Sequence, residues 1–225
     1  MVKQDLISSS PVRLFEAAAE GGLKAGQMGI VTAKKGLGKT SVLVQFGLDS
    51  LIQDKKLVHV SFDQHSSNVI SWYDSVLSEI GKKKNISNIN ELNDSIVRDR
   101  TILNFNQETF TLPKVVNTIK ALKDGGITVS AIVIDGADIE KISKDDMKAV
   151  SDFVKSEKIT AWFSGTNEKA SLKETVSKDL EPFFDTVAHL ASDGSSVQLS
   201  ILKANGKPVE NAKVKLDSKT LLMSK

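Results

Sequence analysis

Two glycines, a lysine and a threonine follow an apolar run in the segment GIVTAKKGLGKTSVLVQFGL, residues 29–48. Backbone N–H groups at the start of a helix can converge on an anion, which the helix dipole also attracts. Gly38 lets the chain pass close to the phosphates of a nucleotide. Lys39 can reach the oxygens of the β- and γ-phosphates, and the Thr40 hydroxyl can ligate Mg²⁺. The order of strand, loop and helix therefore predicts a phosphate-binding loop.

The loop departs from the strict pattern G-x-x-x-x-G-K-[ST] at one position, because Ala33 stands where that pattern has glycine. This position closes the loop where it leaves the strand, and alanine tolerates many such geometries. The alternative is a coincidental Gly-Lys-Thr at the start of a helix. The predicted phosphate-binding residues are Ala33, Lys34, Lys35, Gly36, Leu37, Gly38, Lys39, Thr40 and Ser41.

A nucleotide site also needs an acidic residue at the end of a buried strand, where it can hold the Mg²⁺ water shell. The segment AIVIDG supplies Asp135 after four apolar residues. Aspartate is common at strand ends, so this signal is weak alone and gains force from the phosphate loop earlier in the chain. Thr40 and Asp135 are therefore the predicted Mg²⁺ ligands.

The amino-acid composition and net charge limit which kinds of protein this chain can be and which partners it can bind. The chain has 225 residues, of which 40% are apolar and 26% charged, as in an ordinary soluble globular protein. A net charge of +2 creates no large field for gathering nucleic acid or anionic membrane. The chain has no cysteine, which excludes disulfide and thiolate chemistry. With no long apolar run and no signal-like start, we expect a cytoplasmic protein without a membrane partner.

Alternating strands and helices predict an α/β fold with a mostly parallel central sheet flanked by helices. We expect one domain over residues 1–225, with antiparallel strands at its C-terminal end. The expected strands are 27–33, 56–62, 101–106, 129–138 and 160–164, followed by period-two segments at 185–192, 196–208 and 212–225. The expected helices are 40–53, 67–80, 113–123, 144–156 and a weaker one at 172–180, with 81–100 as a polar surface excursion that has a short helix at 89–96.

Nearly the whole chain resembles the RecA-like ATPases, and within them the branch of KaiC and the DnaB-type helicases. The segment EGGLKAGQMGIVTAKKGLGKT is similar to that branch's entry into its phosphate loop, where DnaB-type proteins often carry alanine at the position of Ala33. LKDGGITVSAIVIDGAD resembles its Walker B segment. The resemblance implies a RecA-like P-loop fold that binds ATP or ADP with Mg²⁺.

The same resemblance implies catalytic and trans-acting residues. VHVSFDQHSSN is similar to the strand end that carries the family's catalytic glutamate, which falls on Asp63. The resemblance thus implies Asp63 and the loop lysine, Lys39, as the catalytic residues. LSILKANG looks like the strand whose lysine and arginine act on a neighbouring subunit's nucleotide, so Lys203 is implied as a nucleotide ligand in trans. Such a head-to-tail contact would close into a ring or run on as a filament. A monomer with Lys203 as an ordinary strand residue is the alternative.

Three positions depart from the family pattern. Asp63 is one methylene shorter than glutamate, which impairs the positioning of an attacking water. Asn205 stands at the position of the trans arginine and carries no charge for the transition state. Gly165 and Thr166 lie where the DnaB-type branch has a glutamine that couples nucleotide state to DNA. These changes predict nucleotide binding with weakened hydrolysis.

The leading interpretation is an ATP-binding protein with slow or regulatory ATPase activity, acting as a nucleotide-dependent switch or assembly protein. One alternative is a non-catalytic interaction or scaffold module, whose protein partner the sequence does not name. Another is a DNA-dependent motor or recombinase, against which the near-neutral charge and the missing glutamine argue.

Overall fold

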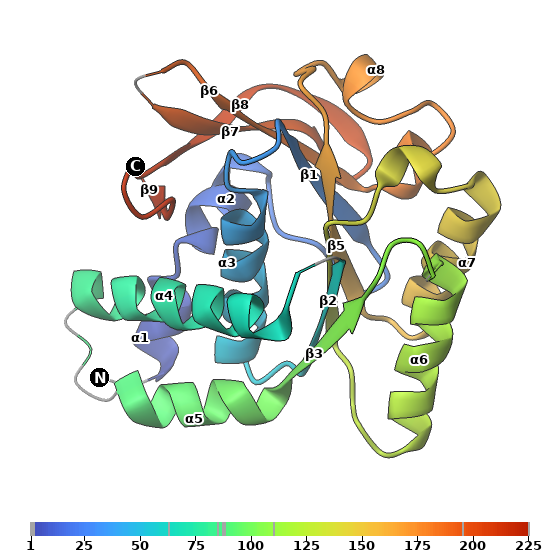
Figure 1. Ribbon diagram of the computed structural model, residues 1–225. Coiled ribbons are helices and arrows are strands. Elements are labelled where there is room, and N and C mark those ends of the chain that lie inside the picture. The colour runs from blue at the N-terminus through green and yellow to red at the C-terminus, as the bar shows by residue number, and fades with distance from the viewer. Residues whose placement is uncertain are drawn as a thin grey trace.

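The computed structural model describes residues 3–62, 64–84, 86, 89–109, 111–194 and 196–224. Its strands are β1 (Met28–Ala33), β2 (Leu57–Phe62), β3 (Arg100–Phe105), β4 (Ala131–Asp135), β5 (Thr160–Thr166), β6 (Thr186–Ser192), β7 (Val197–Ala204), β8 (Lys207–Leu216) and β9 (Met223–Ser224). They form one nine-stranded sheet in the order β3-β2-β4-β5-β1-β6-β7-β8-β9 (Figure 1). Neighbours from β3 to β6 are parallel, and those from β6 to β9 are antiparallel. The predicted α/β class and sheet type are confirmed.

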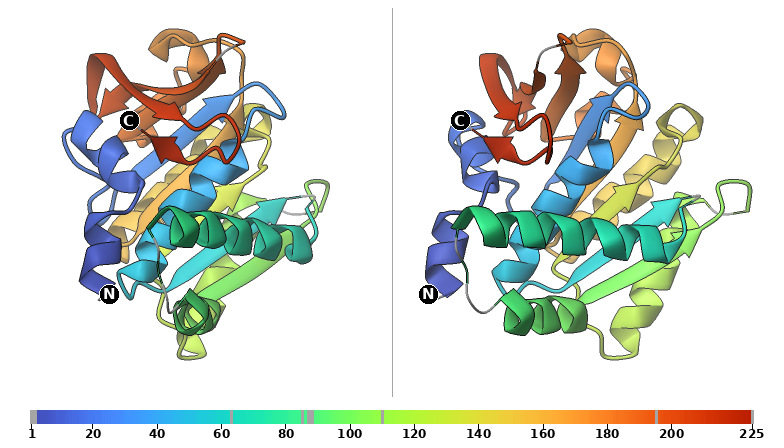
Figure 2. Two further views of the ribbon diagram at one scale, coloured as in Figure 1. Left: turned by 90° about the vertical axis from the view of Figure 1, so that its left-hand side faces the viewer. Right: turned by 60° about the vertical axis from the view of Figure 1, so that its left-hand side comes forward.

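Helices cover both faces of the sheet. They are α1 (Lys3–Ser8), α2 (Val12–Ala18), α3 (Lys39–Ile52), α4 (Ser66–Lys84), α5 (Ile89–Asp99), α6 (Leu112–Asp124), α7 (Lys144–Ser156) and α8 (Leu172–Thr175). Helices α1 to α5 contribute to one apolar core, and α6 and α7 to the core on the opposite face (Figure 1). Figure 2 shows the C-terminal strands β8 and β9 beside α2, which they contact. Among the described residues, no helix has the length and apolarity needed to cross a membrane.

Helix α3 is the most enclosed helix of the site, with 11 of its 14 residues buried. It packs on the sheet and on α4, and a glycine permits this close approach. A Cβ atom at Gly47 would lie 2.4 Å from the Tyr73 hydroxyl of α4. At the base of β1, a Cβ at Gly29 would lie 2.4 Å from the Trp162 ring. The strand and the helix that flank the loop are thus tightly packed against their neighbours.

Several expected elements differ from the observed ones. Strand β6 is antiparallel to β7, as its alternating sequence predicted, but on its other side it is parallel to β1. The polar stretch after residue 80 is largely helical, since α4 continues to Lys84 and α5 runs over 11 residues. α5 buries Ile96 against the core and exposes its polar side. The helix expected at 172–180 ends at Thr175. Helices α1 and α2 were not expected.

Candidate phosphate-binding site

The predicted phosphate loop joins the end of β1 to the start of α3, at the carboxyl edge of the parallel strands. Gly36 and Gly38 both have positive φ, of 81° and 104°, a conformation that favours glycine. The Lys39 ammonium donates to the carbonyls of Ala33, at 3.1 Å, and of Lys34, at 3.3 Å. Burial lowers the pKa of Lys39, while the Asp135 carboxylate opposes that shift.

Ala33 fits the loop without strain. Ala33 is fully buried, and its φ is not positive. Its carbonyl accepts hydrogen bonds from the Lys39 ammonium and, at 3.1 Å, from the Asn167 amide. The missing glycine therefore leaves the strand-to-loop transition intact.

Asp135 ends β4 within hydrogen-bond distance of the loop helix. Its Oδ2 accepts from the Thr40 hydroxyl at 2.7 Å, and its Oδ1 from the Ser164 hydroxyl at 2.7 Å. Ser164 in turn accepts from the Gly136 amide at 2.8 Å. Asp135 is only 3% exposed, so these donors offset the cost of burying its charge. Sequence reasoning paired Thr40 with Asp135 but missed Ser164, whose only signal is a hydroxyl near the end of the strand beside β4.

The remaining loop residues differ in exposure. Lys34 and Lys35 are exposed, and the Lys34 ammonium lies 3.8 Å from Glu168. Leu37 packs against the core. Ser41 is fully buried, and its hydroxyl has no hydrogen-bond partner among the described residues. Lys34 and Lys35 thus supply positive charge at the surface, whereas Lys39 lies in the loop.

Asp63 lies outside the described residues. Strand β2 ends at Phe62, and its Ser61 pairs in register with Asp135. The chain therefore leaves β2 at the same edge of the sheet as the phosphate loop. The role predicted for Asp63 stays a prediction.

Lys203 lies in β7, opposite Val187 of β6. Val187 pairs with Ile30, three positions before Ala33, so Lys203 is about 10 Å from the loop along the strand direction and lies two strands away from β1 across the sheet. Its side chain is 8% exposed, and its ammonium binds the Glu181 carboxylate at 2.6 Å and the Glu181 carbonyl at 3.2 Å. A trans role, which stays a prediction, would require this ion pair to open.

Asn205 has a structural explanation. It forms, with Gly206, the two-residue turn between β7 and β8, and the two residues have φ of 48° and 77°. Asn-Gly is the preferred sequence for such hairpin turns, which need positive φ at both positions. The asparagine at the position where the resemblance implies a trans arginine therefore serves the turn.

The three arginines lie elsewhere in the described part of the chain. Arg13 forms ion pairs with Glu16 and Asp49, and the Arg100 guanidinium lies 4.5 Å above the Tyr73 ring. Arg98 is exposed on α5. None of the three belongs to the loop or to the hydrogen bonds around Asp135.

Asn167, which follows β5, reaches the loop through its backbone amide, which donates to the Ala33 carbonyl. The Asn167 side chain donates to the carbonyls of Glu174 and Thr175, and Thr166 is exposed.

Beneath the loop, the Thr32 hydroxyl lies 3.0 Å from His189 Nδ1. Burial, aided by the charge of Lys39, lowers the pKa of His189, which keeps this ring neutral at pH 7.

The C-terminal segment touches the phosphate loop. A Cβ atom at Gly38 would lie 2.7 Å from the Leu221 side chain. Gln45 of α3 holds this segment with both ends of its amide, donating to the Leu221 carbonyl at 2.9 Å and accepting from the Met223 amide at 2.9 Å. Gln45 is 2% exposed. Loop, helix and C-terminal segment are therefore joined as one unit.

The described residues contain no group of three or more His, Cys, Asp or Glu side chains that could hold a metal ion by themselves. Thr40 and Asp135 offer two hard oxygen atoms, which suits a cation that completes its coordination with phosphate and water. Neither the family models nor the curated proteins searched include a match to this chain.

Proposed function

We propose that the chain binds Mg·ATP or Mg·ADP at the loop between β1 and α3, with the RecA-like P-loop arrangement that its sequence resembles. The contact between the Thr40 hydroxyl and the Asp135 carboxylate carries this proposal. Two side chains remote in sequence meet beside a glycine-bearing loop at a helix start, which is the geometry that nucleotide binding requires.

Each residue has a defined role in the proposed site. The amides of Gly36–Thr40 surround the phosphates, and the Lys39 ammonium moves from its own loop carbonyls to the β and γ oxygens. Thr40 and Asp135 hold Mg²⁺, directly and through its water shell. Ser164 fixes the orientation of the Asp135 carboxylate by its 2.7 Å hydrogen bond. When bound, Mg²⁺ neutralises charge on the phosphates.

We further propose that hydrolysis is slow and that the nucleotide serves as a switch. Asp63, if it is the base, is a shortened substitute for glutamate. Arg13 and Arg100 are paired or stacked away from the loop, and Arg98 is exposed on α5, so none of the three belongs to the loop that would hold the γ-phosphate. The loss of such an arginine costs about 10³- to 10⁵-fold in rate in related chemistry.

Calorimetry with Mg·ADP and Mg·ATP tests the binding proposal. We expect Lys39→Ala to lose most of the affinity while its circular dichroism spectrum and melting curve stay native-like. Lys213→Ala, on the exposed side of β8, is the matched control and should bind like the wild type. Unchanged nucleotide affinity in Lys39→Ala would refute the site.

A scaffold module is the second candidate, favoured by the burial of Lys203 in an ion pair within its own chain. Size-exclusion chromatography with and without ATP separates the two candidates. A switch that assembles through the nucleotide elutes as a larger species with ATP, and Lys203→Met reverses the shift. A scaffold elutes at the same position under all of these conditions.

A further inference from the structure

The Ser61 hydroxyl is fully buried and has no hydrogen-bond partner among the described residues. Ser61 lies in β2, one residue before the strand ends at Phe62. A buried hydroxyl that stays unpaired costs free energy, so such a group is explained by a bound water or ion or by a functional role. Nothing in the proposed function uses Ser61.

Ser61 stands beside Asp135 in the sheet. The two residues are register partners in the parallel pair of β2 and β4. Side chains of register partners lie on the same face of a sheet. For Asp135 this is the face that α3 covers, since its carboxylate accepts from the Thr40 hydroxyl at 2.7 Å. Ser61 therefore shares with Asp135 the interface between the sheet and the loop helix.

A second serine flanks Asp135 from the opposite side. Ser164 lies in β5, and β4 runs between β5 and β2. The Ser164 hydroxyl donates to Asp135 Oδ1 at 2.7 Å, whereas the Ser61 hydroxyl makes no bond to the carboxylate or to any other described residue. The carboxylate is therefore oriented from the side of Ser164, and the Ser61 hydroxyl remains for a group that binds next to Asp135.

The next polar side chain on this face of β2 is His59, two residues earlier. Its Nδ1 lies 3.0 Å from the Tyr73 hydroxyl, and its Nε2 is buried without a partner among the described residues. A structural water shared by Ser61 and His59 is therefore the competing explanation for both atoms.

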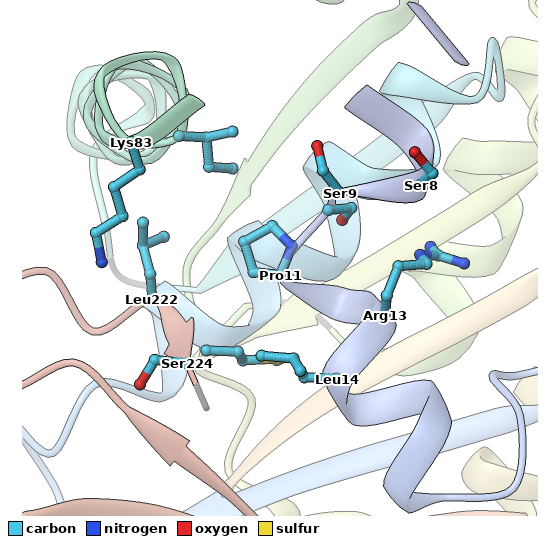
Figure 3. Close-up of a pocket in the computed structure, with 11 residues that line it drawn as sticks. Ser8, Ser9, Pro11, Arg13, Leu14, Lys83, Leu222 and Ser224 are labelled. Carbon is cyan, nitrogen blue, oxygen red and sulfur yellow. The ribbon is translucent and has the colours of Figure 1, made fainter. Parts of the chain in front are cut away.

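The cavity of about 520 Å³ shown in Figure 3 does not supply a partner for Ser61. Its lining residues come from the two N-terminal helices and the link between them, from α4 and from the C-terminal segment, and none comes from β2 or β4. A ligand of Ser61 must therefore come from the side of Asp135.

We propose that the Ser61 hydroxyl accepts a hydrogen bond from a water of the Mg²⁺ shell at the nucleotide site, which makes Ser61 a positioning residue for the metal. This inference rests on the proposed function. Mg²⁺ gives up its waters reluctantly and usually keeps several of them. A site with two protein oxygens, from Thr40 and Asp135, thus needs neighbouring groups that orient those waters. The unpaired hydroxyl beside Asp135 supplies such a group.

Calorimetry of ADP with and without Mg²⁺ on Ser61→Ala tests the proposal. Without Mg²⁺, ADP should bind as it does to the wild type, whereas the affinity gained from Mg²⁺ should fall about tenfold. The melting temperature of the nucleotide-free protein should not fall, because the change removes an unpaired buried group. Ser50→Ala is the control, since the Ser50 hydroxyl donates within α3 to the Phe46 carbonyl at 3.2 Å, and it should keep the full Mg²⁺ effect.

A pair of variants with the same shape isolates the hydroxyl. Ser61→Thr keeps it and should retain the Mg²⁺ effect, whereas Ser61→Val lacks it and should behave like Ser61→Ala. An undiminished Mg²⁺ effect in Ser61→Ala would overturn the proposal. If the melting temperature also fell, the hydroxyl would belong to the structural water shared with His59.

The same measurements separate this proposal from the nucleotide site itself. A wild-type protein that binds no ADP would refute the nucleotide site. A Mg²⁺ effect that is lost in Asp135→Asn but kept in Ser61→Ala would refute the role of Ser61 alone.

Discussion

The Thr40 hydroxyl donates to Asp135 at 2.7 Å although the two residues are 95 positions apart in the chain. Their contact depends on the parallel order of the sheet, which brings the ends of β1 and β4 to one edge. Ser164 holds the other carboxylate oxygen, so Asp135 has little rotational freedom.

Asp135→Asn should reduce the Mg²⁺ dependence of nucleotide binding. The change keeps the size of the side chain and removes its charge, so we expect the affinity gained from Mg²⁺ to fall about 10- to 100-fold. Calorimetry of ADP with and without Mg²⁺ measures this gain. Asp138→Asn is the control, because Asp138 pairs with Lys141 outside the hydrogen bonds of Asp135. An undiminished Mg²⁺ effect in Asp135→Asn would remove Asp135 from the metal site.

ATP turnover should be well below about 10 s⁻¹, the median value for enzymes, because a general base and a trans cation each contribute about 10²- to 10⁴-fold. Phosphate release measures it. If Asp63 is the base, Asp63→Asn should abolish the residual rate and Asp63→Glu should preserve or raise it. A wild-type rate in the ordinary range would contradict weakened hydrolysis.

Glu181→Gln should destabilise the protein more than Lys203→Met. Removing the carboxylate leaves a buried ammonium unpaired, whereas removing the lysine also removes the cost of burying its charge. Lys203 is 8% exposed and Glu181 26% exposed at their side chains, so the lysine is the more deeply buried partner. Urea unfolding curves compare the two variants. The reverse order would mean that the ammonium reaches water when Glu181 is lost.

Stability should fall as the pH is lowered from about 6.5 toward 4 through His59. Burial lowers the pKa of His59 from 6.5 to about 4, and its Nδ1 lies 3.0 Å from the Tyr73 hydroxyl. Between these two pKa values the imidazole is protonated in the unfolded chain and neutral in the folded protein. The free energy of unfolding therefore falls by about 1.4 kcal/mol for each pH unit. Urea unfolding at pH 8, 6.5 and 5 should show a shallower loss in His59→Gln. His189, whose pKa is also lowered, adds a loss of the same sign that remains in this variant.

Gly29→Ala should destabilise the protein by about 1–3 kcal/mol, since the new methyl meets an aromatic ring that has no room to move. The nearest ring atom of Trp162 lies at 2.4 Å from the Cβ position, and Trp162 stacks on Phe46 at 4.1 Å between centroids. Thermal unfolding measures the loss. Gly125→Ala, where the Cβ meets only carbonyls at 3.4 Å, should cost much less. Equal losses would mean that Trp162 repacks.

The sequence predicted those parts of the fold in which local pattern and tertiary environment agree. Four apolar residues before Asp135 indicated a strand buried on both faces, and β4 lies between β2 and β5. The helix of residues 144–156 was predicted at its observed bounds, and in the structure Ser143 caps it by accepting from the Asp146 amide at 3.1 Å. The meeting of Thr40 and Asp135 followed from the parallel sheet.

The remaining features depend on packing that no local pattern carries. The polar residues of β6 lie on both of its faces, and one of them, His189, is buried in contact with Thr32. α5 was underestimated because its apolar residues are few, although Ile96 is buried. Asn205 was interpreted through a family position, whereas Asn-Gly between two strands is itself a hairpin signal.

The two hydrogen bonds of Gln45 make the C-terminal end of the chain a sensitive place for a fusion tag. A peptide appended after residue 225 would pull on Met223 and Leu221, and therefore on the glycine that shapes the loop. The atoms nearest to a Cβ at this glycine belong to Leu221 and Leu190, and none belongs to α1. Measurements of nucleotide affinity on this protein should therefore use an N-terminal, cleavable tag.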